Sequence, residues 1–170
     1  DKAIAVSVDS SANYCKSHPL TGGKQIVCEN WRNLISVGAK PLAITNCLNF
    51  GNPENQEIMG EFAECLEGIK EACEFLNFPV VSGNVSFYNG TNKKNIYPTP
   101  VIGGVGVINE LLKPLSHSFK KENSSLLLVG KTFGHIEQSS FLKEVHSITE
   151  GNPPKVNLIN EKNNGEAVLN

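Results

Sequence analysis

The feature that most constrains the fold is a long amphipathic helix pattern between two runs of strand-forming residues. Residues 42–48 precede this pattern and residues 79–88 follow it, and both runs are rich in apolar and β-branched side chains. Together they predict a strand, a helix and a strand in succession, which is an order found in α/β and α+β proteins. The helix, predicted over residues 54–76, carries a stripe with the 3.6-residue period: Ile58, Phe62, Cys65, Leu66, Ile69, Cys73 and Leu76.

The rest of the chain extends this alternation. A polar, Lys-bearing loop is predicted over 89–95 and a polar connector over 111–123. The connector indicates a domain boundary, so we expect a first domain over 1–112 and a partial second domain over 113–170. The other expected elements are strands at 3–8, 101–108 and 125–130, a helix from Lys24 to near Gly38 after a loop with Gly22-Gly23, and helices at 138–146 and 155–170.

Composition excludes several classes of protein. The 170 residues carry a net charge of −2, which leaves no basic surface for nucleic acid or anionic membranes. No apolar run approaches the roughly 20 residues that span a bilayer, and no signal peptide begins the chain, so we expect a cytoplasmic protein. The five cysteines lack metal or disulfide spacing and are expected to be buried thiols. Because the chain starts without Met and stops within a predicted helix, we expect it to be a piece of a longer polypeptide.

Three polar or glycine-rich clusters fall at predicted strand ends. They are Thr45–Pro53, the tetrapeptide Gly83-Asn84-Val85-Ser86, and the run Gly103-Gly104-Val105-Gly106. Glycines let a backbone approach a phosphate, and an Asn oxygen is a hard ligand that suits Mg²⁺. By strand alternation Asn84 and Ser86 share one face, so both can address one ligand.

Structural explanations of the same residues stay open. Gly83-Asn84 is equally compatible with a β-bulge in an ordinary strand, and Gly103-Gly104 with close strand–helix packing. Neither the P-loop nor the dinucleotide-binding fingerprint is present. His135 precedes a predicted helix, where capping or packing is the simpler interpretation.

Several motifs resemble phosphoribosylformylglycinamidine synthase, the synthetase subunit of the formylglycinamide ribonucleotide amidotransferase of purine biosynthesis. The residues that carry the resemblance cover essentially the whole chain. They are TNCLNFGNPE at 45–54, PVVSGNVSFYN at 79–89, PTPVIG at 98–103, Gly134-His135 with Gln138-Ser139, and Gly22-Gly23, Glu29, Arg32-Asn33 and GAKPL at 38–42.

The resemblance implies a fold, a reaction and cofactors. It implies an α/β domain like the N-terminal domain of aminoimidazole ribonucleotide synthetase, with a mixed sheet and helices on one face, followed by a truncated C-terminal-type domain. The chain is similar to the second of the family's two related halves. In the family ATP phosphorylates an oxygen of formylglycinamide ribonucleotide, and ammonia then displaces phosphate to leave the amidine; ATP and Mg²⁺ are the implied cofactors.

The family's motifs also imply roles for individual residues. Gly83 and Asn46 correspond to nucleotide contacts, Asn84 to a Mg²⁺ ligand, and Ser86 to a substrate contact. Members carry Asp where this chain has Asn46, and the change removes a negative charge. No residue here matches the family's catalytic histidine, which belongs to the first half, so His135 is not assigned that role.

The implied partners are the first half of the same polypeptide, a glutaminase subunit and a small third subunit. The sheets of the two halves pair into a central barrel in the family, so an isolated half is expected to self-associate, for example as a homodimer. Two alternatives are weighed: a non-catalytic structural half with a relaxed nucleotide site, and another ATP-using enzyme of the same superfamily. The fragment alone is expected to be inactive.

Overall fold

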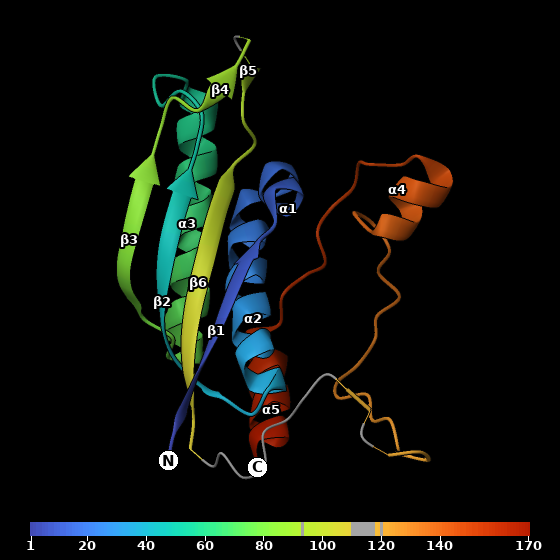
Figure 1. The fold of residues 1–170 in the computed structure, drawn as a ribbon. Coiled ribbons are helices and arrows are strands. Elements are labelled where there is room, and N and C mark those ends of the chain that lie inside the picture. The colour runs from blue at the N-terminus through green and yellow to red at the C-terminus, as the bar shows by residue number, and fades with distance from the viewer. Residues whose placement is uncertain (93, 110–117, 120) are drawn as a thin grey trace.

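The computed structural model describes residues 1–92, 94–109, 118–119 and 121–170. Its centre is a four-stranded mixed sheet with the strand order β1-β6-β2-β3 (Figure 1). In chain order the elements are β1 (Ala3–Ser10), α1 (Ala12–Ser17), α2 (Pro19–Ser36), β2 (Lys40–Asn49), α3 (Gln56–Leu76), β3 (Val80–Ser86), β4 (Gly90–Thr91), β5 (Lys94–Asn95), β6 (Thr99–Ile108), α4 (Ser140–His146) and α5 (Leu158–Leu169).

The predicted strand–helix–strand unit is confirmed as β2-α3-β3. β2 and β3 are parallel neighbours, whereas β6 runs antiparallel to both β1 and β2. In Figure 1, α2 and α3 lie along the same side of the sheet. The mixed sheet with helices on one face is therefore as expected, and we call the opposite side the open face.

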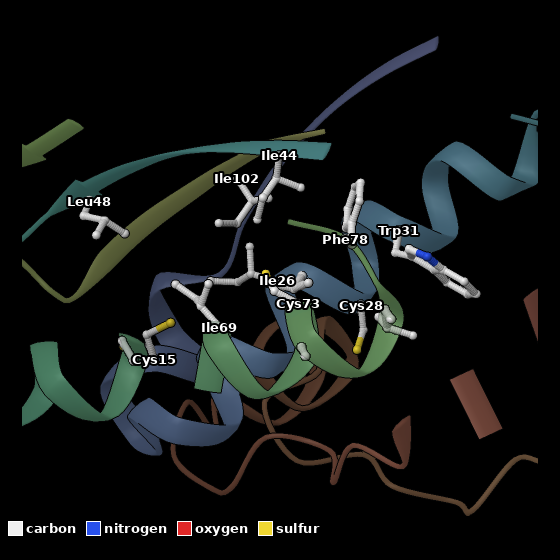
Figure 2. Close-up of a cluster of buried hydrophobic side chains, with 14 of the residues drawn as sticks. Cys15, Ile26, Cys28, Trp31, Ile44, Leu48, Ile69, Cys73, Phe78 and Ile102 are labelled. Carbon is white, nitrogen blue, oxygen red and sulfur yellow. The ribbon is translucent and has the colours of Figure 1, made fainter. Parts of the chain in front are cut away.

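The core lies between the sheet and the two long helices. Ile44 and Leu48 of β2 and Ile102 of β6 point from the sheet toward the helices (Figure 2), and all three are at most 3% exposed. The helices meet them with Ile26 and Ile69, which are equally buried. The expectation of buried thiols is confirmed for four cysteines, Cys15, Cys28, Cys65 and Cys73, which lie in this core, and is wrong for Cys47, which is exposed. Burial raises the pKa of Cys28 and of Cys73 to about 12, so these thiols stay protonated at neutral pH.

The prediction of a loop before Lys24 is wrong. α1 occupies part of that segment and α2 begins at Pro19, since proline is favoured in the first helical turn and His18 Nδ1 accepts a 3.3 Å hydrogen bond from Thr21 N. The glycines inside α2 serve packing rather than turning. A Cβ at Gly23 would overlap the Cys65 carbonyl oxygen of α3, so glycine allows the two helices to approach closely.

The prediction of a strand over 125–130 is also wrong. These residues form no regular element, and Leu126, Leu127 and Leu128 are 78–88% exposed. Local apolar and β-branched content does not make a strand without a neighbour to complete its hydrogen bonds, and no described strand pairs with this segment.

The other C-terminal predictions and the hairpin loop differ less from the structure. The helices predicted at 138–146 and 155–170 are confirmed as the shorter α4 and α5. The predicted loop 89–95 is exposed where described, apart from the half-buried Asn89, but it contains the short antiparallel pair β4–β5. Most of the connector 111–123, with the predicted boundary at 112/113, lies outside the described residues. In the described part of the chain, no helix is both long and apolar enough to cross a membrane.

Candidate functional site

The carboxyl ends of β2 and β3 bring the four predicted site residues together. The two strands are parallel, so their ends meet at one edge of the sheet. In their register Asn46 is paired with Gly83, Cys47 with Asn84 and Asn49 with Ser86. The sequence prediction that these motifs gather at strand ends is therefore matched by the geometry.

The pairing divides the four residues between the two faces of the sheet. Ile44 and Leu48 point toward the helices, so Asn46, which lies between them at the same parity, faces that side with its partner Gly83. Asn84 and Ser86 lie on the open face, where their neighbours on β2 are Cys47 and Asn49. Asn84 is exposed and Ser86 is half-buried. The expectation that Asn84 and Ser86 share a face agrees with this register.

Gly83 leaves room for the side chain of Asn46. A Cβ at position 83 would overlap Asn46 Oδ1, so only glycine lets that carboxamide lie across β3. The alternative of a bulge at Gly83-Asn84 is wrong, because β3 is continuous through both residues. The register shift lies earlier, where Ile44 pairs with Val80 but Thr45 pairs with Ser82, and Val81 is the extra residue.

Two backbone hydrogen bonds join the end of β3 to the loop after β2. Phe50 N donates to the Ser86 carbonyl at 3.0 Å, and Tyr88 N donates to the Gly51 carbonyl at 2.9 Å. β3 ends at Ser86 rather than at the predicted residue 88, because Tyr88 adopts a left-handed φ of 59°. The side chain of Asn89 adds a further hydrogen bond to this connection, from Nδ2 to the Phe50 carbonyl oxygen. Asn89 was not among the residues predicted from the sequence, although the Asn-Gly dipeptide at 89–90 is a turn signal.

Three aromatic rings hold the connection between β3 and the loop after β2 against α3. Phe62 of α3 contacts Phe50 and Phe87 edge-on, with ring centroids 5.1 Å apart in both pairs. Phe50 is 1% exposed, so the loop after β2 is anchored in the core. Phe87 thus packs against the core, whereas Tyr88 is 65% exposed.

The glycine-rich run of β6 is explained by packing. Gly104 faces the helices, where an added Cβ would overlap Asn30 Oδ1 and lie 3.0 Å from Phe78 Cζ. Asn30 is fully buried, and its Nδ2 is within 3.2 Å of Ser7 O, Asp9 Oδ2 and Ile102 O. This carboxamide thus ties α2 to β1 and β6, and the geometry favours the packing explanation for Gly104, whereas Gly103 lies on the open face.

Two groups of charged residues lie near the sheet, around Lys16 and around Glu29. Lys16 of α1 contacts the buried Glu61 of α3, with Nζ and Oε1 2.5 Å apart, and the pKa of Lys16 is raised mainly by this hydrogen bond. Burial raises the pKa of Glu29, the Asp9 carboxylate raises it further, and Arg32 lowers it. Neither cluster contacts the ends of β2 and β3 through a hydrogen bond or salt bridge in the described residues.

His135 has a structural contact. Its Nε2 lies 3.0 Å from the Asn152 carbonyl oxygen, and α4 is capped instead by Ser139, whose Oγ accepts from Leu142 N at 3.2 Å. A cavity of about 570 Å³ lies away from β2 and β3, between α1, Tyr97 and residues 138–151. It contains none of the four predicted site residues.

The residues present supply one ligand for a magnesium ion but not a complete metal site. The Asn84 oxygen is a hard donor on an exposed face, and Mg²⁺ in nucleotide sites keeps waters and phosphate oxygens as its other ligands. Within the described ranges no three His, Cys, Asp or Glu side chains converge as a metal cluster. Any metal bound at Asn84 therefore needs further ligands from elsewhere.

Comparisons with known proteins match this fold and these motifs. Residues 1–108 match the family model described as "AIR synthase related protein, N-terminal domain". Phosphoribosylformylglycinamidine synthase subunit PurL of Pelagibacter ubique is 61% identical over 169 residues, which are 99% of this chain and 23% of that protein. The subunit of the same name from Bradyrhizobium diazoefficiens is 54% identical over 167 residues, which are 98% of this chain and 23% of that protein. The resemblance predicted from the motifs is confirmed.

Solved structures agree. Structures described as T. maritima PurL complexed with ATP and with FGAR superpose with a TM-score of 0.60 at 38% identity, covering 64% of this chain and 18% of that one. The chain thus spans about a quarter of the length of the curated relatives that it matches.

Proposed function

Because this chain belongs to the AIR synthase related family, with the N-terminal domain of that family over residues 1–108, we propose that it is part of an ATP-dependent formylglycinamide ribonucleotide amidotransferase. The intact protein converts formylglycinamide ribonucleotide, ATP and glutamine-derived ammonia to formylglycinamidine ribonucleotide, ADP and phosphate. The identities of 61% and 54% to PurL subunits and the T. maritima PurL complexes with ATP and FGAR support this assignment.

The observation that carries the proposal is the register at the ends of β2 and β3. It sets Asn84 and Ser86 side by side with Cys47 and Asn49 on a face that no described helix covers. Uncharged oxygen and nitrogen donors at the carboxyl ends of neighbouring parallel strands are well placed to bind a phosphorylated ligand.

Each residue has one task in this reaction. The γ-phosphoryl group of ATP passes to an amide oxygen of the substrate, and ammonia then attacks that carbon and expels phosphate, so protein groups mainly position the reactants. Ser86 hydrogen-bonds the substrate, and Gly83 and Asn46 contact the nucleotide. Asn84 would supply one oxygen to Mg²⁺, which neutralises phosphate charge when bound.

The open face suggests the partner within the same polypeptide. Ile4, Val6 and Val8 of β1 are 72%, 68% and 67% exposed on it, which is unfavourable in water unless another surface covers them. We assign this face to the sheet of the protein's first half, so the isolated chain self-associates and is inactive. A glutaminase subunit and a small third subunit complete the cytoplasmic complex, and the chain divides into domains at 1–112 and 113–170.

The residue at position 46 bears on whether this half binds a nucleotide or serves mainly as a structural half. Asn46 has no negative charge, which favours the alternative in which this half is mainly structural. Asn46→Asp in the full-length protein tests it: a lower KM for ATP supports a nucleotide contact at this position. An unchanged KM for ATP and unchanged turnover show that position 46 does not touch the nucleotide.

The proposed activity is tested by turnover of the full-length protein with ammonia as the nitrogen donor. The wild type is expected to release phosphate only when both ATP and formylglycinamide ribonucleotide are present. Asn84→Ala is expected to lower kcat/KM at least about tenfold, as for the loss of a contact to a charged group, and Ser86→Ala about 5- to 10-fold, as for one lost hydrogen bond. Ser82→Ala is the matched control on the same strand and face, and wild-type kinetics in both site variants would refute the site.

A further inference from the structure

Both polar atoms of the Asn89 carboxamide contact the hydroxyl of Ser86. Asn89 Nδ2 lies 3.0 Å from the Phe50 carbonyl oxygen, 3.0 Å from the Ser86 carbonyl oxygen and 3.1 Å from Ser86 Oγ. The Ser86 hydroxyl is in turn 3.3 Å from Asn89 Oδ1. Asn89 is thus the side chain through which the strand end, the loop after β2 and the Ser86 hydroxyl are connected.

The distances indicate which hydrogen is free for a ligand. An amide nitrogen has two hydrogens, and the two backbone carbonyls at 3.0 Å are their nearest acceptors. The contact from Ser86 Oγ to Asn89 Oδ1 is 3.3 Å, well beyond the usual 2.7–2.8 Å of a hydroxyl hydrogen bond. Ser86 Oγ thus lies against the carboxamide, 3.1 Å from Nδ2, while its own hydrogen is weakly held, so the hydroxyl can donate to a bound molecule.

The backbone explains why Asn89 is available for this task. Tyr88 has a φ of 59°, and this left-handed residue reverses the chain so that Asn89 lies beside Ser86 three positions back. Asn89 N also donates to the Phe50 carbonyl at 3.2 Å. Since Phe50 is buried against Phe62, the carboxamide is fixed to the core.

We propose that Asn89 is a positioning residue that orients the Ser86 hydroxyl toward the substrate. This inference rests on the proposed function, because Asn89 acts through the substrate contact at Ser86. Removing the carboxamide frees the Ser86 rotamer, so the substrate must order the hydroxyl when it binds, and this cost disappears when Ser86 itself is replaced by alanine.

A double-mutant cycle on the full-length protein tests this coupling. The KM for formylglycinamide ribonucleotide and the kcat are measured for the wild type, Ser86→Ala, Asn89→Ala and the double variant, with thermal unfolding of each. We expect Ser86→Ala to raise KM about 5- to 10-fold, the value of one lost hydrogen bond. Asn89→Ala is expected to raise KM about threefold or more, and the double variant to match Ser86→Ala within about twofold.

The chain offers a matched control for loosening of the loop. Asn95 Oδ1 accepts a 2.9 Å hydrogen bond from Asn52 N in the same loop but makes no hydrogen bond to Ser86. Asn95→Ala destabilises the loop without reaching the hydroxyl, so its effect on KM is expected to multiply with that of Ser86→Ala. Asn89→Ser, which keeps a small polar side chain but loses both amide hydrogens, is the second variant in case Asn89→Ala does not fold, and the same coupling is expected.

The outcomes of this experiment distinguish failure of the inference about Asn89 from failure of the proposed function. If Ser86→Ala raises KM but the effects of Ser86→Ala and Asn89→Ala multiply, Asn89 is a structural residue and the inference alone is wrong. If Ser86→Ala leaves KM unchanged, the substrate contact itself is wrong. If the wild type has no turnover of this substrate, the proposed function fails.

Discussion

Replacing Gly104 with alanine tests how the centre of the sheet is packed. The new methyl group would overlap Asn30 Oδ1, and Asn30 cannot move aside freely because its Nδ2 lies within 3.2 Å of three acceptors. Overpacking of a core costs about 1–3 kcal/mol, and each displaced hydrogen bond costs about 1 kcal/mol. We therefore expect Gly104→Ala to lower the free energy of unfolding by about 3 kcal/mol.

The neighbouring glycine is the control. A Cβ at Gly103 would lie on the open face, 3.1 Å from Thr45 Cγ2, where a small movement relieves the contact. Gly103→Ala is thus expected to change stability by less than about 0.5 kcal/mol, as at most surface positions. The two substitutions add the same methyl group to adjacent residues of one strand and differ only in the side that they face.

Urea unfolding followed by tryptophan fluorescence is a suitable assay. Trp31 is the only tryptophan and is 6% exposed, so its emission reports loss of the core. With an m-value of about 2 kcal/mol/M, a loss of about 3 kcal/mol lowers the midpoint by about 1.5 M. Equal midpoints for Gly103→Ala and Gly104→Ala would refute the packing explanation of this glycine run.

Three further changes probe the charges and the last helix. Lys16→Met leaves the carboxylate of Glu61 buried without its partner and is expected to cost about 1–2 kcal/mol at pH 7, measured by urea unfolding. Burial raises the pKa of Glu29 above its usual 4.5, so ionisation of Glu29 disfavours the folded state; Glu29→Gln should stabilise the chain at pH 7, and the gain should vanish below pH 4.5. Gly165→Ala would overlap the Trp31 ring, so it should separate α5 from α2 and shift the Trp31 emission to the red; an unchanged spectrum would contradict this contact.

The sequence predicted elements best where a single stretch contains the whole signal. The apolar stripe from Ile58 to Leu76 runs along nearly all of the 21-residue helix α3, so its period alone identifies the helix. The start of α2 was missed because Gly22-Gly23 is typical of a loop, whereas here glycine serves contact between helices. A strand over 125–130 was expected from composition, but strand formation depends on a partner that no local sequence encodes.

In the candidate site, too, features that one strand determines were predictable and features that depend on tertiary contacts were not. That Asn84 and Ser86 share one face follows from alternation, and the structure agrees. That Gly83 faces the opposite side follows from the same alternation, whereas the placement of Asn46 beside Gly83 depends on the pairing of β2 with β3, which is tertiary information. Asn89 depends on the left-handed conformation of Tyr88, a tyrosine conformation that sequence statistics disfavour.

The central claim is that the end of β3 binds formylglycinamide ribonucleotide in the intact protein. Isothermal titration of this substrate into the full-length protein, as wild type and as Ser86→Ala, is the most direct test. The account predicts measurable binding to the wild type and about 5- to 10-fold weaker binding to Ser86→Ala, with unchanged thermal unfolding. Equal dissociation constants for the two proteins would contradict it.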